Sequence, residues 1–222
     1  MLKKRSLMMG WGLLTLFALW TLAVRMVDVQ SIGPGGSVVG FATLNRLVHN
    51  FTGVNWMLYT VTDWLGLVPV AVVLGFGLLG LCQWIRRRKL QKVDGSILVL
   101  GGFYMAVLGM YTLFEKLVIN YRPVLILGYL EASYPSSTTM LALCVMPTAM
   151  MQLQTRLPKG KIKAGVQVIM AGFTAFMVVG RLLSGVHWIS DIIGGILLSS
   201  GLVLLYHGVS GISLDPGRDN RL

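Results

Sequence analysis

Charged side chains and cysteines are both scarce in this sequence. Only 12% of the 222 residues are Asp, Glu, Lys or Arg, whereas 55% are hydrophobic and the mean hydropathy is +0.74. The two cysteines, Cys82 and Cys144, lie in apolar runs, which favours packed thiols over a disulfide or a metal-binding pair. The histidines and cysteines form no cluster that would suggest zinc, so we expect no metal and no other cofactor.

Several apolar runs are long enough to cross a bilayer, which indicates an all-α, polytopic membrane protein. The first run follows Lys3, Lys4 and Arg5 as in a signal peptide, but no small-residue cleavage site follows it, so we expect a retained anchor. The length suits one integral membrane domain over residues 1–222 with no attached soluble domain. We expect a bundle of six transmembrane helices, at about residues 7–24, 57–84, 96–113, 136–153, 165–182 and 188–207.

The distribution of Lys and Arg predicts which side each loop faces. If the N-terminus is cytoplasmic, five of the 19 cations fall on the outer side: Arg25, Arg46, Lys116, Arg122 and Arg181. Because cation-rich loops stay in the cytoplasm, we expect both termini there, with Arg218 and Arg221 among the inner cations. The basic residues are scattered over short loops, so the net charge of +11 reflects topology and attraction to anionic lipid. We expect no nucleic-acid binding.

The segment from Gly180 to Asp191 places an arginine, a histidine and an aspartate at the mouth of an apolar span. His187 follows Arg181 by six residues and precedes Asp191 by four, so on a helix the carboxylate would share a face with the imidazole and could orient it. Charged residues beside hydrocarbon are costly, which makes them candidates for function. The alternative is an ordinary interface cluster, in which Arg181 reaches toward water and Asp191 begins a helix.

Two further polar segments fall on the same predicted side. The loop at 114–135 carries Lys116 and Arg122, and a proline followed by Ser136, Ser137 and Thr138 begins the fourth span. Such a sequence is a good helix start, where free backbone N–H groups attract anions. Two arginines, a hydroxyl-rich helix start and a His/Asp pair together describe a phosphate site with a nucleophile. The competing interpretation, a set of caps and interface anchors, would have to account for all three segments at once.

In these segments the chain resembles the membrane type-2 phosphatidic acid phosphatases, a superfamily related to vanadium haloperoxidases. Its third motif, Ser-Arg-x5-His-x3-Asp, is intact from Arg181 to Asp191, with Gly180 in place of the serine. Its second motif, Pro-Ser-Gly-His, reads Pro-Ser-Ser-Thr, so Thr138 stands at the histidine position. The resemblance spans residues 96–207, which form the motif-bearing core of the expected domain.

The first motif of this family, Lys-x6-Arg-Pro, is degraded. Arg122 and the proline after it are kept, but the lysine position holds Glu115, and Lys116 is one place too close to the arginine. One position around a helix is about 100°, so Lys116 would need a helix irregularity to reach a phosphate. Glu115 would repel phosphate if it pointed inward, and we expect it to face away or to be paired.

The resemblance implies a role for each site residue. His187 would attack phosphorus to form a phosphohistidine, and Asp191 would hold the imidazole in its reactive tautomer. No metal would take part. The phosphate-binding residues would be Arg122, Arg181, Ser136, Ser137 and Thr138, with help from Lys116.

Thr138 changes the chemistry that the motif implies. The histidine of the family protonates the leaving oxygen, a contribution of about 10²–10⁴ in rate, and threonine has no titratable proton near neutral pH. An alkoxide leaving from a phosphate monoester needs that proton, whereas a phosphate leaving from a diphosphate is less basic and needs it less. If the chain is catalytic, a lipid diphosphate is therefore favoured over phosphatidate.

Residues 41–51 carry apolar side chains near one helical stripe. The segment would either lie in the outer interface, beside a lateral entry for a lipid tail, or form a short packing helix.

The sequence thus predicts a multi-pass protein of a bacterial plasma membrane that hydrolyses a lipid phosphate or diphosphate, such as a polyprenyl diphosphate, at an outward-facing site. The alternative is a catalytically silent relative that binds lipid phosphates or helps to move them. A transporter without phosphate chemistry would leave the His/Asp/Arg spacing unexplained. The expected partners are the bilayer and the lipid substrate, and the oligomeric state is left open.

Overall fold

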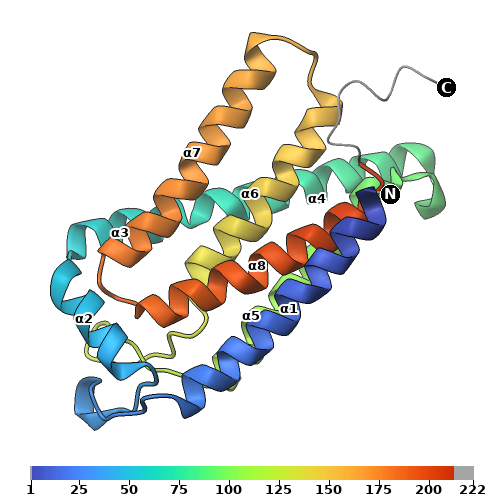
Figure 1. The fold of residues 1–222 in the computed structure, drawn as a ribbon. Helices are drawn as coiled ribbons and strands as arrows, with labels where there is room; N and C mark the ends of the chain where they lie inside the picture. The colour runs from blue at the N-terminus through green and yellow to red at the C-terminus, as the bar shows by residue number, and fades with distance from the viewer. Residues whose placement is uncertain (1, 213–222) are drawn as a thin grey trace.

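The computed structural model describes residues 2–212, and within them the chain is helical, with three isolated β-bridges in its loops (Figure 1). The predicted all-α class is therefore confirmed, while Arg218 and Arg221 lie outside the described residues. The helices are α1 (Leu2–Met26), α2 (Ala42–Thr52), α3 (Trp56–Leu65), α4 (Leu67–Arg87), α5 (Gly95–Lys116), α6 (Ser137–Arg156), α7 (Lys161–Leu183) and α8 (Ile189–Ser210), with short 3-10 turns at η1 (Pro34–Gly36) and η2 (Leu90–Lys92).

Helix α8 runs through the middle of the bundle, where it packs against α1, α5 and α6 (Figure 1). Its contact with α1 is close because glycines on both helices face the neighbour. A Cβ atom on Gly201 would lie 2.8 Å from the Leu14 side chain and 3.2 Å from the Gly10 carbonyl oxygen. Small residues let two helix backbones approach in this way inside membranes. The start of α1 and the end of α8 consequently lie at the same end of the molecule.

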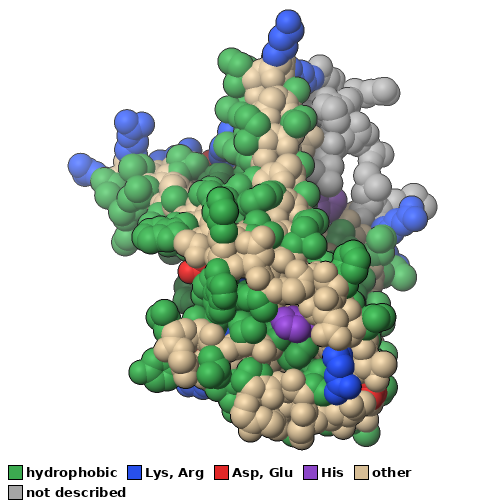
Figure 2. All heavy atoms as spheres, turned by 90° about the vertical axis from the view of Figure 1, so that its left-hand side faces the viewer, with side chains coloured by type: hydrophobic (Ala, Val, Ile, Leu, Met, Phe, Trp, Pro, Cys, Tyr) green, Lys and Arg blue, Asp and Glu red, His purple; other side chains and the backbone are tan. Residues whose placement is uncertain are grey.

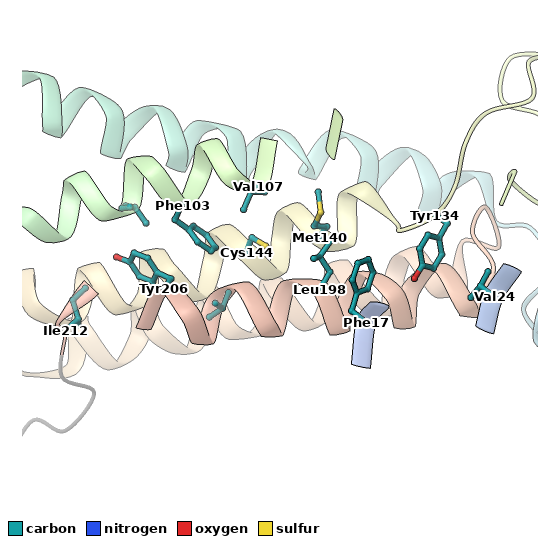
Figure 3. Packing of buried hydrophobic residues seen from close by; sticks show 12 residues of the cluster. Phe17, Val24, Phe103, Val107, Tyr134, Met140, Cys144, Leu198, Tyr206 and Ile212 are labelled. Atoms are coloured by element: carbon teal, nitrogen blue, oxygen red, sulfur yellow. The ribbon is translucent and has the colours of Figure 1, made fainter. Parts of the chain in front are cut away.

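Buried hydrophobic side chains from α1, α5, α6 and α8 form a continuous core (Figure 3). Near one end of this core the ring of Phe17 stacks on Tyr134 at 6.2 Å, and Phe114 meets Phe17 edge-on at 5.5 Å. The Tyr134 hydroxyl also shares a 2.7 Å hydrogen bond with Thr21 on α1. Because Tyr134 directly precedes the turn into α6, these contacts fix where α6 begins.

Five helical segments are long and apolar enough to cross a membrane: Lys3–Met26, Trp56–Arg87, Gly95–Lys116, Lys161–Leu183 and Ile189–Ser210. The chain is thus a multi-pass membrane protein, but the predicted count of six spans is not confirmed. The expected fourth span corresponds to α6, which is not among the five. Helix α6 lies inside the bundle and buries the polar side chains of Thr139, Thr148 and Gln152.

The outer surface of the helices is apolar over much of its area. Figure 2 shows hydrophobic side chains over the sides of the helices, with blue Lys and Arg side chains at the tips. On α7 the side chains of Ile162, Val168 and Ile169 are largely exposed, as are Leu74 and Leu78 on α4. Such surfaces are stable when hydrocarbon covers them, as expected of helices that face lipid.

Helix α2 packs on the bundle, which agrees with one of the two arrangements expected for its sequence. Ala42 and Asn45 are buried, and Asn45 hydrogen-bonds to the first turn of α8. On the same helix Leu47 and Phe51 are 68% and 89% exposed. One side of α2 therefore packs on the bundle, and its other side presents apolar groups outward.

The close contact between α1 and α8 yields a stability prediction. Replacing Gly201 by valine should force the two helices apart and cost about 1–3 kcal/mol, as overpacking of tight contacts does. The thermal unfolding midpoint in detergent micelles should fall relative to the wild type. The matched control is Gly109→Val on α5, where an added Cβ meets no atom within 4 Å. Equal midpoints for the two variants would contradict the assigned contact.

Candidate functional site

The loop between α7 and α8 carries His187 into the interior at one end of the bundle. The chain leaves α7 at Ser184, and Gly185 then turns with a positive φ of +67°. A Cβ atom at Gly185 would lie 1.8 Å from the Gly53 carbonyl oxygen, so only glycine allows this crossing. The tight turn leaves His187 only 3% exposed.

Two arginines converge on one ring nitrogen of His187. Its Nε2 atom lies 3.2 Å from Arg122 Nη1 and 3.5 Å from Arg181 Nη2. Guanidinium groups only donate hydrogen bonds, so Nε2 must accept and the ring proton resides on Nδ1. The arrangement therefore directs the Nε2 lone pair at the space between two cations, where an anion would bind.

The environment of His187 favours its neutral form. Burial is the largest cause that lowers its pKa well below the usual value, followed by the positive charges of Arg122 and Arg181. The backbone of Ser133 acts in the opposite direction. A neutral imidazole keeps its lone pair, which is the form that a nucleophile requires.

Asp191 lies on the other side of the imidazole and is fully buried. Its Oδ2 atom is 3.9 Å from His187 Nδ1, which is longer than a hydrogen bond. The same oxygen accepts a 3.1 Å hydrogen bond from the Trp188 backbone, so Asp191 also caps the start of α8. His187 precedes that helix, and the loop rather than a shared helical face brings the two side chains together.

A buried amide network holds the Asp191 carboxylate, and no motif or spacing in the sequence predicted it. Asn120 Nδ2 donates to Asp191 Oδ1 at 3.1 Å and to Ser190 Oγ at 3.3 Å. Asn45 on α2 donates to Ser190 Oγ at 3.0 Å and accepts from the Ser190 backbone at 3.2 Å. Both asparagines are buried, so the network fixes the carboxylate from behind and links α2 to the site.

Each arginine has a carboxylate partner that the motif pattern did not include. Arg122 Nε lies 3.0 Å from Glu131, which belongs to the same loop. Arg181 Nη1 lies 3.6 Å from Asp63 of α3 and donates to Thr62 at 3.3 Å. The Arg181 guanidinium also stands over the Tyr59 ring at 5.0 Å. These partners offset the cost of burying two like charges side by side.

Two of the three predicted hydroxyl residues, Ser137 and Thr138, border two neighbouring cavities. A polar cavity of about 460 Å³ is bordered by His187, Arg122, Glu131 and Ser137. An apolar cavity of about 490 Å³ lies beside it between α4, α5 and α6, and Thr138 borders only this one. Tyr111, Met140 and Ser137 border both cavities.

Ser136, Lys116 and Glu115 differ from their expected positions. Ser136 is buried, and its hydroxyl donates to Thr139 at 3.0 Å while its backbone N–H donates to Asp191, so it does not border the polar cavity. Lys116 is exposed and borders neither cavity. Glu115 was expected to face away or to be paired, but it lines the polar cavity together with Arg122 and His187.

The donor set of the site suits an anion rather than a metal ion. Arg122 and Arg181 supply guanidinium donors, and His187 supplies a lone pair between them. Within residues 2–212 the structure groups no three His, Cys, Asp or Glu side chains in a way that could hold a metal. The arrangement can therefore bind a phosphate and attack it with the imidazole.

Comparisons with known proteins identify a family and a similar fold. A family model described as the PAP2 superfamily matches residues 91–212. The fold is similar to the crystal structure of the first transmembrane PAP2 type phosphatidylglycerolphosphate phosphatase from Bacillus subtilis, with a TM-score of 0.59, 19% sequence identity, and coverage of 90% of this chain and 93% of that chain. No curated protein matches the sequence.

The lowered pKa of His187 predicts a dependence of stability on pH. An unfolded histidine takes up a proton below about pH 6.5, whereas the buried imidazole resists protonation, so acid favours the unfolded chain. Lowering the pH from 7.5 to 5.5 should cost the wild type about 1.4 kcal/mol more than it costs His187→Gln. Thermal unfolding midpoints in micelles at the two pH values measure this difference. Parallel losses in both proteins would show that the imidazole titrates normally.

Proposed function

This chain belongs to the PAP2 superfamily and is a membrane-embedded hydrolase of phosphoric esters, and on that premise we propose that it dephosphorylates a membrane lipid through a phosphohistidine on His187. One observation carries the proposal. His187 Nε2 is buried between Arg122 and Arg181, with Asp191 behind the ring. In this proposal His187 is the nucleophile, the two arginines clamp the anion, and Asp191 supplies the counter-charge for the imidazole.

In the first step the Nε2 lone pair attacks the terminal phosphorus of the lipid. The P–Nε2 bond forms while the bond from phosphorus to the leaving oxygen breaks, and the electron pair leaves with that oxygen. Arg122 and Arg181 neutralise the equatorial oxygens of the phosphoryl group as charge builds on them. The imidazole gains a positive charge, which the Asp191 carboxylate at 3.9 Å stabilises. In the second step water displaces the imidazole and releases phosphate.

The two adjoining cavities support a lipid substrate. The polar one would hold the headgroup phosphates beside His187, and the apolar one would hold the start of the tail. A further apolar groove of about 580 Å³ between α4 and α5 continues from it through Val73, Tyr104 and Met105. Together they form a path from the site along the lipid-facing side of the bundle, which suits one long tail.

Thr138 restricts which leaving groups can depart from the phosphorus. It borders the apolar cavity and carries no titratable proton, so it cannot protonate a leaving alkoxide. A phosphate leaving group tolerates this absence, and the substrate class that we propose is therefore a polyprenyl or similar lipid diphosphate. The cation distribution supports a site on the outer face of the membrane, and the membrane that we propose is a bacterial plasma membrane.

A paired substrate panel tests the proposal. Purified wild type should release phosphate from a lipid diphosphate faster than from the matching monophosphate, by up to about 10²–10⁴, the usual contribution of a general acid. His187→Ala should fold normally and release none. If the wild type exceeds His187→Ala on neither lipid, the catalytic role fails for these substrates, and the alternative of a silent binder of lipid phosphates replaces it.

The groove between α4 and α5 predicts a dependence on tail length. Gly102 borders it, and a Cβ there would meet no protein atom within 4 Å, so Gly102→Leu should fill the groove without disturbing the fold. The variant should lose about 10-fold or more in kcat/KM for long polyprenyl diphosphates. This loss corresponds to about two CH2 groups of the tail that are no longer buried in the groove. A short-chain diphosphate should be unaffected. Gly109→Leu, which borders neither the groove nor the cavities, is the control, and equal effects on both chain lengths would exclude the groove as the tail site.

A further inference from the structure

The two glutamates of the polar cavity differ in their surroundings. Glu131 forms an ion pair with Arg122 Nε at 3.0 Å and is held by it. Glu115 lies in the last turn of α5 and borders the same cavity, and among residues 2–212 it makes no ion pair and no hydrogen bond through its side chain. The Glu115 carboxylate is therefore free to accept a proton inside the cavity that contains His187.

The other groups on the cavity wall are poorly suited to accept a proton. Arg122 and Ser137 are donors or weak bases, and His187 is occupied as the nucleophile. The Tyr134 hydroxyl is engaged with Thr21 at 2.7 Å, and burial raises its pKa. Glu115 is the acidic group that remains available.

The helical phase of α5 places Glu115 on the wall of the cavity that contains His187. Tyr111 borders both cavities, so it marks the junction where the lipid tail would meet its headgroup. Glu115 follows Tyr111 by four residues on the same face of α5, one turn further toward the loop that carries Arg122. After the lipid product departs, water would enter the polar cavity, which both His187 and Glu115 border.

We propose that Glu115 is the general base for hydrolysis of the phosphohistidine, an inference that rests on the proposed function above. The Glu115 carboxylate takes a proton from water as the water oxygen forms a bond to phosphorus. The P–Nε2 bond breaks, its electron pair returns to the imidazole, and phosphate leaves. Glu115 then gives its proton to the solvent that reaches this exposed side chain. The guanidinium groups of Arg122 and Arg181 offset the repulsion between the carboxylate and the phosphoryl group.

Glu115→Gln separates this role from a purely electrostatic one. If Glu115 only repels phosphate, its loss should lower KM and leave kcat the same or higher. If it is the base for the second step, kcat should fall about 10²–10⁴-fold, while formation of the phosphohistidine continues. Lipid product should then appear in a burst of one equivalent per enzyme, and phosphoenzyme should accumulate.

The experiment uses the full chain in detergent and a short-chain lipid diphosphate with a ³²P label on its terminal phosphate, followed by rapid quenching. Glu115→Gln should retain acid-labile label at one equivalent per enzyme, and hydroxylamine, a nucleophile that needs no base, should release it. Thr112→Ala on α5, an exposed residue that borders neither cavity, should behave as the wild type does.

Two results would overturn the assignment of Glu115. One is wild-type turnover in Glu115→Gln, and the other is a loss of turnover without accumulated label. Failure of the proposed function looks different, because the wild type and Thr112→Ala would then show neither label nor turnover.

Discussion

Two buried guanidinium groups directed at one imidazole nitrogen are the constraint on which the rest of the site depends. Arg122 and Arg181 approach His187 Nε2 to 3.2 and 3.5 Å, an arrangement that is unfavourable unless the charges are compensated. The protein compensates them with Glu131 and Asp63 and keeps His187 neutral. An arriving phosphate would add the negative charge that this space favours. The site is therefore organised before any substrate binds.

The bundle holds this arrangement by fixing the loop before α6 and helix α1 against helix α8. The start of α8 carries Asp191, which receives hydrogen bonds from Asn120 of the loop before α6 and from its own first turn. The glycine contacts between α1 and α8 and the packing of Tyr134 on Phe17 hold these segments in position relative to one another. Because every polar member of this network is buried, a displacement of any segment would leave unpaired groups and cost free energy.

The two adjoining cavities differ in polarity. The polar cavity offers charged groups and the His187 imidazole, and the apolar one offers a hydrocarbon-like wall between α4, α5 and α6. Ser137, in the first turn of α6, stands where the two meet. A phosphorylated lipid presents the same division, with a charged end and a long tail, so the shape of the site and its chemistry select the same class of molecule.

The sequence by itself determined the membrane class, the helical fold and the grouping of Arg122, Arg181, His187 and Asp191, because residue type and spacing in three short segments carry that information. The tertiary structure decided the rest. Packing placed α6 inside the bundle, where it buries polar side chains and need not be as apolar as a lipid-facing span. The helical phase of α5 turned Glu115 rather than Lys116 into the cavity. Asn45 and Asn120 join the site only through contacts between distant segments, and neither lies in a motif or a periodic pattern. Contacts of this kind depend on how helices pack, which local spacing along the chain does not encode.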